Sequence, residues 1–290
     1  MRLHIIYLSR KSIGRNNILI LIQNLIKTLV YGNLIVAFSG ALLSSSFAKL
    51  VSIDSYIEYG LFTFFAILGL YNYHRLSKMN ALINADLKNW CLKHKTLLYA
   101  WTIFSFIGAL FLVQLLIIDI ETVVLLLIPT VSMSIWYIIP IFNIRLRDIP
   151  FVKAPIVALS WTSVLIAFPL INQYSLTVND YFRILAFVLY FLALTIPFDI
   201  RDKHVDIKDQ RTLPQLAGTT ISKAGALLFL IGFYAIFAII NEELRFSIPF
   251  LVALSFTAVL LLLSNERRSY AFFALVDFSM AMIALAFFYK

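Results

Sequence analysis

Nine apolar runs, each close to the length that crosses a lipid bilayer, dominate this sequence and restrict what it can fold into. They cover residues 28–48, 56–73, 97–118, 122–142, 152–171, 180–198, 222–240, 247–264 and 270–289. Lipid offers the backbone no hydrogen-bond partners, so runs of this kind must be helical. The composition agrees, since only 13% of the residues are charged, against about 25% in soluble domains. The sequence therefore predicts an all-α integral membrane protein with nine transmembrane helices.

The runs follow one another without a long linker rich in proline, glycine or serine. We therefore expect a single membrane domain over residues 1–290, in which residues 1–27 form a cytoplasmic or interfacial N-terminal segment. The first residues are basic, but they lack the apolar core and the following small residues of a cleaved signal peptide. The sequence thus predicts that the N-terminal segment is retained.

The basic residues are distributed unevenly over the two sides of the predicted bundle. Twenty of the 24 Lys and Arg residues lie in the N-terminal segment and in the second, fourth, sixth and eighth loops. Cytoplasmic segments collect such residues, so we expect a cytoplasmic N-terminus and a C-terminus on the opposite side. The net charge of +9 therefore marks topology and does not indicate nucleic-acid binding. We expect a multi-pass protein of a bacterial cytoplasmic membrane.

Four carboxylates directly follow the sixth run, where lipid gives way to water. Asp199, Asp202, Asp206 and Asp209 are spaced three, four and three residues apart. If this segment stays helical, all four share one face. Such a cluster could hold a divalent cation, or phosphate through one. The alternative is a solvated loop whose carboxylates balance nearby cations, namely Arg201, Lys203, Lys208 and Arg211.

One carboxylate, Asp277, lies inside the ninth apolar run. A charge at the centre of a membrane helix costs roughly 3 kcal/mol on insertion scales, so it normally faces the bundle interior or a wet cavity. Asp277 therefore has either a functional role or a packing role through an interhelical hydrogen bond.

Polar and cationic residues also gather where two other runs meet the cytoplasmic side. Asn72, Arg75 and Lys78 follow the second run, and Arg145 and Lys153 flank the loop after the fourth. Cations and amides at these places could contact an anionic group of a lipid or substrate. The alternative is that they mark topology and extend toward lipid headgroups.

Over nearly its whole length the chain resembles the UbiA superfamily of intramembrane prenyltransferases. The resemblance rests on the nine runs, on Asp199, Asp202 and Asp206 ahead of Thr212-Leu213-Pro214, on the connector from Tyr137 to Lys153, and on Asp277. It implies a UbiA-like bundle that transfers an isoprenoid group from a polyprenyl diphosphate to a lipophilic acceptor, such as an aromatic compound. In that family two acidic motifs hold Mg²⁺ against the diphosphate.

The resemblance assigns Asp199, Asp202 and Asp206 as the catalytic and metal-binding residues. It places the diphosphate against Asn72, Arg75, Lys78, Arg145 and Lys153.

The chain departs from the family at the first acidic motif. That motif reads Asn-Asp, two residues, Asp, three residues, Asp; here it falls on Asn72, Tyr73, Leu76 and Asn80. All three carboxylates are absent, and the nearby cations could contact diphosphate directly in place of one metal. The alternative function is therefore a non-catalytic UbiA-fold protein that binds a lipid, a quinone or a membrane-protein partner.

Overall fold

A computed structural model describes residues 20–82, 84–116, 119–173, 175–204, 206 and 210–289. Residues 1–19 of the predicted N-terminal segment, and Asp209 of the acidic cluster, lie outside the described residues. A helix over Ile20–Tyr31 comes first. The α-helices that follow are α2 (Leu34–Leu50), α3 (Tyr56–Ser77), α4 (Ala85–Lys93), α5 (Lys95–Leu115), α6 (Ile120–Thr122), α7 (Ile128–Ile138), α8 (Lys153–Thr162), α9 (Phe168–Gln173), α10 (Val178–Asp202), α11 (Leu213–Ile240), α12 (Glu242–Arg245), α13 (Ile248–Leu263) and α14 (Tyr270–Phe288).

Each of the nine predicted apolar runs is largely helical, which confirms the all-α class. Six helices among the described residues are long and apolar enough to cross a membrane, and a bent pair adds a seventh. Helix α3 has sufficient length, but its polar residues reduce its hydropathy, and α13 has 16 residues. A multi-pass membrane protein is thereby supported, while nine spans and the orientation of the termini stay predictions.

Two of the runs continue through π-helical turns. Val123–Leu127 joins α6 to α7, and Ser163–Ala167 joins α8 to α9. Such turns often occur near functional sites because they shift the register of the side chains that follow.

The first predicted span is not one straight helix. Ile20–Tyr31 and α2 meet at 58°, and Asn33 between them has a positive φ of 60°. Asparagine tolerates this left-handed conformation better than most residues. A Cβ atom at the preceding Gly32 would lie 2.5 Å from the Trp101 ring, so the close approach of α5 requires glycine. The break ends the helix where the side chain of Asn33 reaches the interior.

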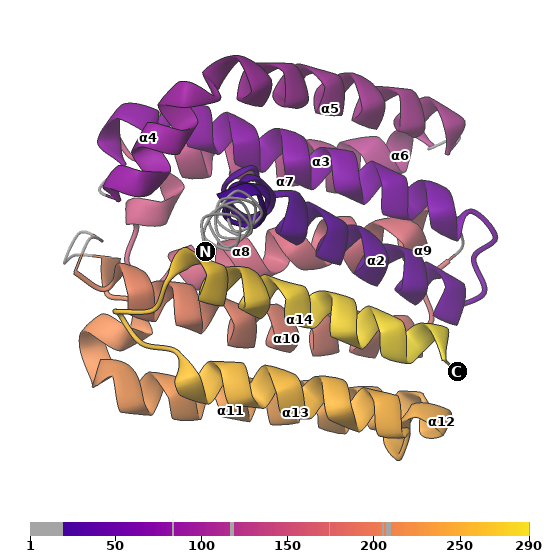
Figure 1. Ribbon diagram of the computed structural model, residues 1–290. Coiled ribbons are helices and arrows are strands. Elements are labelled where there is room, and N and C mark those ends of the chain that lie inside the picture. The colour runs from indigo at the N-terminus through magenta and orange to yellow at the C-terminus, as the bar shows by residue number, and fades with distance from the viewer. Residues whose placement is uncertain are drawn as a thin grey trace, which may run out of the picture.

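The long helices run side by side from one end of the molecule to the other (Figure 1). The order across the view is α5, α3, α2, α14 and α10, with α11 and α13 beyond α10 and with α7 and α8 behind. Phenylalanines from α10, α11, α13 and α14 fill the interior between those helices; Phe237 and Phe287, for example, stack with ring centroids 5.2 Å apart.

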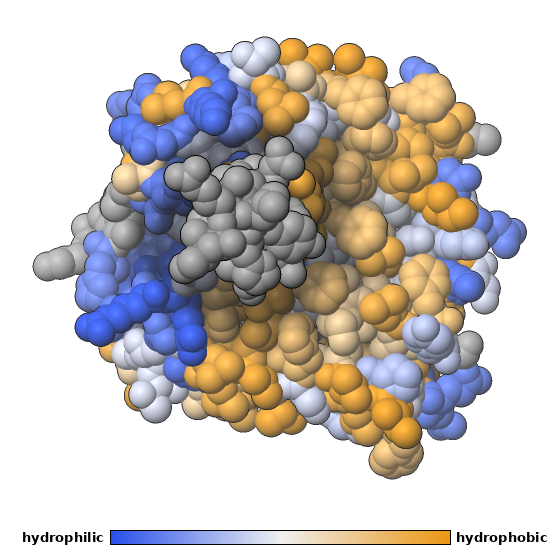
Figure 2. All heavy atoms as spheres, viewed as in Figure 1, coloured by the Kyte–Doolittle hydropathy of each residue, from blue (hydrophilic) through white to orange (hydrophobic). Residues whose placement is uncertain are grey.

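The outer surface has an apolar band between two polar ends. Figure 2 shows this band across the long helices and hydrophilic residues at the end that carries α4. Large exposed side chains such as Ile103, Phe104 and Ile107 of α5 belong to the band. A bundle that faces lipid requires an exposed apolar belt of this kind.

Candidate functional site

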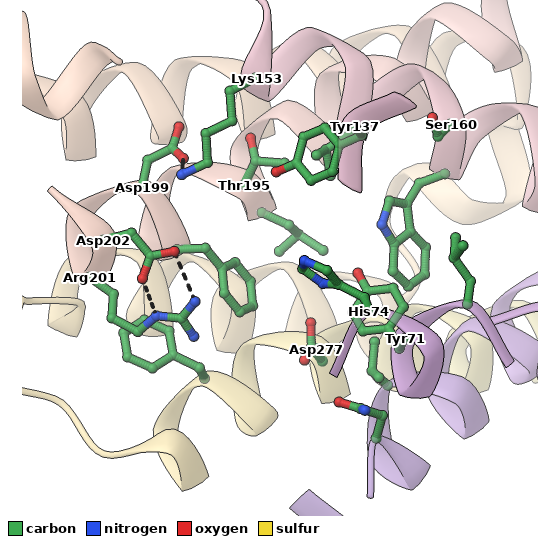
Figure 3. A pocket seen from close by; sticks show the side chains of 18 of the residues that line it. Tyr71, His74, Tyr137, Lys153, Ser160, Thr195, Asp199, Arg201, Asp202 and Asp277 are labelled. Carbon is green, nitrogen blue, oxygen red and sulfur yellow. Dashed lines mark hydrogen bonds and ion pairs between the residues drawn. The ribbon is translucent and has the colours of Figure 1, made fainter. Parts of the chain in front are cut away.

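A cavity of about 400 Å³ opens among residues of α2, α3, α7, α8, α10 and α14. Much of its wall is apolar, and aromatic side chains line it from five helices (Figure 3). These aromatic residues are Tyr71, Tyr137, Trp161, Phe191, Phe198, Tyr270 and Phe273. Such a wall suits a long hydrocarbon chain, because the apolar surface of the chain is buried against apolar side chains.

Charged residues occupy the same cavity wall and include more cations than carboxylates. The cations are Arg75, Lys78, Arg147, Lys153 and Arg201, and the carboxylates are Asp199, Asp202 and Asp277. The cavity therefore combines an apolar wall with an excess of positive charge. This combination matches a ligand that has an apolar chain and an anionic head.

Lys153 joins two of the predicted site carboxylates. Its buried ammonium lies 2.8 Å from Asp199 Oδ1 and also forms an ion pair with Asp206. Arg147 Nη2 donates to the other oxygen of Asp206 at 2.8 Å. Lys153 begins α8, where the helix dipole disfavours a cation, and the two carboxylates offset this cost. The acidic segment after the sixth run is thus tied to the connector after the fourth.

The third carboxylate of the cluster has its own cation. Asp202 accepts two hydrogen bonds from the Arg201 guanidinium, at 2.7 and 3.0 Å. Figure 3 shows this pair beside the separate pair of Lys153 with Asp199. The alternative that the acidic residues balance nearby cations holds for this pair, whereas Asp199 and Asp206 pair with residues about 50 positions away in the sequence.

The helical face predicted for the cluster is only partly formed. α10 ends at Asp202, although the Asp206 amide still donates to the Asp202 carbonyl at 2.8 Å. Because this bond continues the turn, Asp206 remains beside Asp199 and both reach Lys153.

The two segments that carry these charges also meet outside the cavity. Arg145 forms two hydrogen bonds with Asp148, and Gln210 Nε2 donates to Asp148 at 3.1 Å. Burial raises the pKa of the Asp148 carboxyl, but the hydrogen bonds from Arg145 and Gln210 outweigh this effect and keep the pKa below its usual value. Arg145 lines a shallower hollow that it shares with Lys78 and does not line the main cavity.

Asn72 lies behind the cavity wall. It is fully buried, and its Oδ1 accepts a hydrogen bond from Asn33 Nδ2 at 2.8 Å. Asn33 Oδ1 in turn accepts from Arg75 Nη2 at 2.9 Å. The helix break at Asn33 therefore places an amide between Asn72 and Arg75, so Asn72 can influence a ligand through these two neighbours.

Lys78 and Arg75 form no ion pair with any described carboxylate. Lys78 follows the last residue of α3 and is partly buried. Burial, together with the neighbouring Arg147 and Arg145, lowers the pKa of its ammonium to about 8. Its ammonium thus has no described carboxylate within ion-pair distance, although Asp148 and Asp206 are near enough to raise its pKa.

Asp277 extends from α14 into the cavity near Tyr71 and His74 (Figure 3). It forms no hydrogen bond or ion pair with the described residues. The Nε2 atom of His74 is also buried without a partner among them. The packing role predicted as one option for Asp277, through an interhelical hydrogen bond, therefore lacks a partner in the described part of the chain.

The carboxylates as they are paired do not fit a magnesium ion. Mg²⁺ requires carboxylate oxygens that are free to enter an octahedral shell. Here both oxygens of Asp202 and of Asp206, and Oδ1 of Asp199, contact ammonium or guanidinium groups. Within the described ranges, no three acidic, histidine or cysteine side chains form a possible metal site. The magnesium site stays a prediction.

Of the residues that the sequence assigned to one site, Arg75, Lys78, Lys153, Asp199, Asp202 and Asp277 line the cavity, whereas Asn72, Arg145 and Asp206 do not. The sequence assigned no role there to Arg147 or Arg201. Each of these is adjacent to or within a few residues of a predicted site residue. The signal that could have found them is therefore positive charge next to a predicted site residue, Arg145 for Arg147 and Asp202 for Arg201.

The comparisons with known proteins bear on the fold. No protein-family model matches the chain, and no curated protein matches it by sequence. A solved structure described as giving structural and mechanistic insights into digeranylgeranylglyceryl phosphate synthase in membranes is similar, with a TM-score of 0.54 and 16% identity. The match covers 90% of this chain and 95% of the other. The UbiA-like fold expected from the sequence is thereby confirmed.

Proposed function

We propose that this chain, which shares its fold with a membrane-embedded synthase, is an intramembrane prenyltransferase. Its donor is an isoprenoid diphosphate, and its acceptor is a lipophilic molecule that enters the same cavity from the membrane. The observation that carries the proposal is the cavity itself, in which aromatic walls meet an excess of cations.

The two parts of such a donor match the two parts of the cavity. The isoprenoid chain lies along the aromatic wall, and the diphosphate lies against Arg75, Lys78, Arg147 and Lys153. Asp199 and Asp206 hold Lys153 and Arg147 in place by their ion pairs. Asp202 does the same for Arg201. Asp277, in the deeper part near Tyr71, faces the space left for the acceptor.

The chemistry follows from this placement. When the allylic C–O bond breaks, the diphosphate leaves with the electron pair and gains negative charge, which the cations at the wall stabilise. The allylic carbocation lies between aromatic faces, which attract positive charge. A nucleophilic atom of the acceptor forms the new bond to carbon and releases its proton.

A direct test is diphosphate release from farnesyl or geranylgeranyl diphosphate by the purified chain in nanodiscs made from bacterial lipid extract. We expect release above that of empty nanodiscs, and an at least tenfold lower rate for Arg147→Gln, because one charge-assisted contact to the leaving group is worth about 1.5 to 3 kcal/mol. Lys93→Gln on the exposed part of α4 is the matched control. Release no greater than that of empty nanodiscs, with or without added Mg²⁺, contradicts the proposal.

A second candidate is a non-catalytic protein that binds a lipid or quinone in this cavity. The observation in its favour is that the described carboxylates of the second motif are paired with cations, while the first motif is absent. The same measurement separates the two functions. Binding of the diphosphate without its cleavage supports the second.

Donor binding should also depend on pH through Lys78. Its folded pKa of about 8 is set by burial, with Arg147 and Arg145 lowering it and Asp148 and Asp206 raising it. As the pH rises from 7 to 9, the ammonium loses its proton, so we expect donor affinity to fall about tenfold through this range. Lys78→Arg keeps its charge and should remove most of this fall. An equal pH dependence in both proteins would assign the titration to another group.

A further inference from the structure

We propose that the cavity binds the phosphate groups of its ligand through side-chain cations and without a divalent metal. Arg75 and Lys78 are the primary contacts, and Arg147 is beside them. The inference rests on the proposed function only for the class of ligand, an isoprenoid diphosphate. It concerns how the head group is held, which the proposed transfer reaction leaves open.

The first step is that intramolecular cations already neutralise the described acidic residues at the end of α10. Asp199 and Asp206 share the Lys153 ammonium, Arg147 contacts the second oxygen of Asp206, and Arg201 holds Asp202 through two hydrogen bonds. A metal ion at these carboxylates has to displace the buried Lys153 ammonium and two partly buried guanidinium groups. Breaking a buried ion pair leaves uncompensated charge and is strongly unfavourable.

The second step is that two cations in the cavity have no carboxylate partner among the described residues. Arg75 donates to the neutral amide of Asn33, and Lys78 forms no ion pair. Both are partly buried, and a charge removed from water is costly unless an opposite charge accompanies it. Their place at the end of α3 gives only the modest stabilisation that a helix C-terminus offers a cation. An anion in the cavity supplies the missing counter-charge.

The third step is geometric. Lys78 follows His74 by four residues and Arg75 by three at the end of α3, so it shares a face with each of them. All three line the cavity. These three residues lie between Tyr73, Leu76 and Asn80 in the sequence. Those are the positions at which the first acidic motif of the UbiA superfamily has carboxylates that this chain lacks. A head group bound here therefore meets guanidinium and ammonium donors, where a metal-dependent site presents metal-bound carboxylates.

The helix break at Asn33 keeps this site in place. Asn33 Oδ1 accepts from one guanidinium nitrogen of Arg75 at 2.9 Å, which leaves the other nitrogens free to donate to phosphate oxygens. Arginine is suited to this role, because its planar fork can form two parallel hydrogen bonds to a phosphate group. Asn72 fixes Asn33 from behind through its 2.8 Å hydrogen bond.

The test is equilibrium binding of farnesyl diphosphate to the full chain in phosphatidylcholine nanodiscs, followed by the fluorescence of tryptophan, since Trp161 lines the cavity. One series contains EDTA and the other an excess of magnesium chloride. We expect the two dissociation constants to agree within about twofold. Farnesol should bind much more weakly in both series. Nanodiscs that contain phosphatidic acid test whether a lipid phosphate occupies the same site.

Variants connect the binding to the named residues. We expect Arg75→Gln and Lys78→Gln each to weaken farnesyl diphosphate binding in EDTA by about tenfold, the value of one charge-assisted hydrogen bond. Arg75→Lys should recover part of the affinity and reports on whether a charge suffices. Lys93→Gln on α4 is the matched control and should bind as the unaltered chain does. Circular dichroism checks that each variant is folded.

The outcomes separate the two proposals. Binding that EDTA abolishes and Mg²⁺ restores overturns the metal-free site and leaves the proposed function intact. No binding of farnesyl diphosphate in either series overturns both. Competition by phosphatidic acid that depends on Arg75 in EDTA supports the metal-free site and assigns it to a lipid headgroup.

Discussion

Replacing Lys153 by methionine should destabilise the protein by about 3 to 5 kcal/mol, the cost of removing one partner of a buried ion pair. The substitution leaves Arg147 as a partner for Asp206, but it leaves Asp199 without a cation. Both side chains of the Lys153–Asp199 pair are less than a tenth exposed, so water cannot replace the lost ammonium. Unfolding of the purified chain by SDS in mixed micelles, followed by circular dichroism, measures the loss.

A second substitution distinguishes lost charge compensation from lost packing. Adding Asp199→Asn to Lys153→Met removes the uncompensated carboxylate, and we expect the double variant to regain most of the stability. Lys93→Met, at an exposed position of α4, is the matched control and should be nearly neutral. A double variant as unstable as Lys153→Met alone would show that the Lys153 side chain acts through its volume.

The fold could be predicted because lipid narrows the possibilities. Apolar runs of about 20 residues can only be helices, and the structure has a helix for each run. The break at Gly32–Asn33 could not be predicted, since glycine and asparagine also occur in continuous membrane helices. It coincides with the close approach of Trp101 to Gly32, which are 69 positions apart in the sequence.

The sequence predicts many residues of the site but not the contacts between them. Spacing alone placed Asp199, Asp202 and Asp206 together, and Lys153 was identified as a cation that could contact an anionic group. That Lys153 contacts two of these carboxylates depends on the packing of α8 against α10. Sequence spacing does not specify the contact between two helices, so a bound phosphate and two carboxylates were equally good partners for Lys153.

These pairings give the missing first acidic motif a physical meaning. A site that keeps one set of carboxylates could in principle keep one metal ion. In this chain each described member of the set is paired with a cation: Asp199 and Asp206 with residues of another segment, and Asp202 with the adjacent Arg201. The former position of the other set presents Arg75 and Lys78. An anionic head group therefore meets cations without an ion-pair partner at the end of α3 and a neutralised cluster at the end of α10.

The second large effect is expected at Arg201, which joins the acidic cluster to the aromatic wall. Its guanidinium lies 4.9 Å from the ring centroid of Phe273, and Phe198 and Tyr270 are similarly close. Arg201→Met removes these cation–π contacts and both hydrogen bonds to Asp202. We expect a loss of about 3 kcal/mol in the same unfolding measurement, because contacts to a charged group and to aromatic faces are lost together.

Arg201→Lys isolates the geometry of the guanidinium from its charge. An ammonium group cannot form two parallel hydrogen bonds with Asp202, so this variant should fall between the unaltered chain and Arg201→Met. Arg267→Met, at an exposed position before α14, is the matched control. If Arg201→Met is no less stable than Arg267→Met, the pair with Asp202 contributes nothing in solution. Asp202 would then be free for another cation, and the case for a neutralised acidic cluster would fail at that residue.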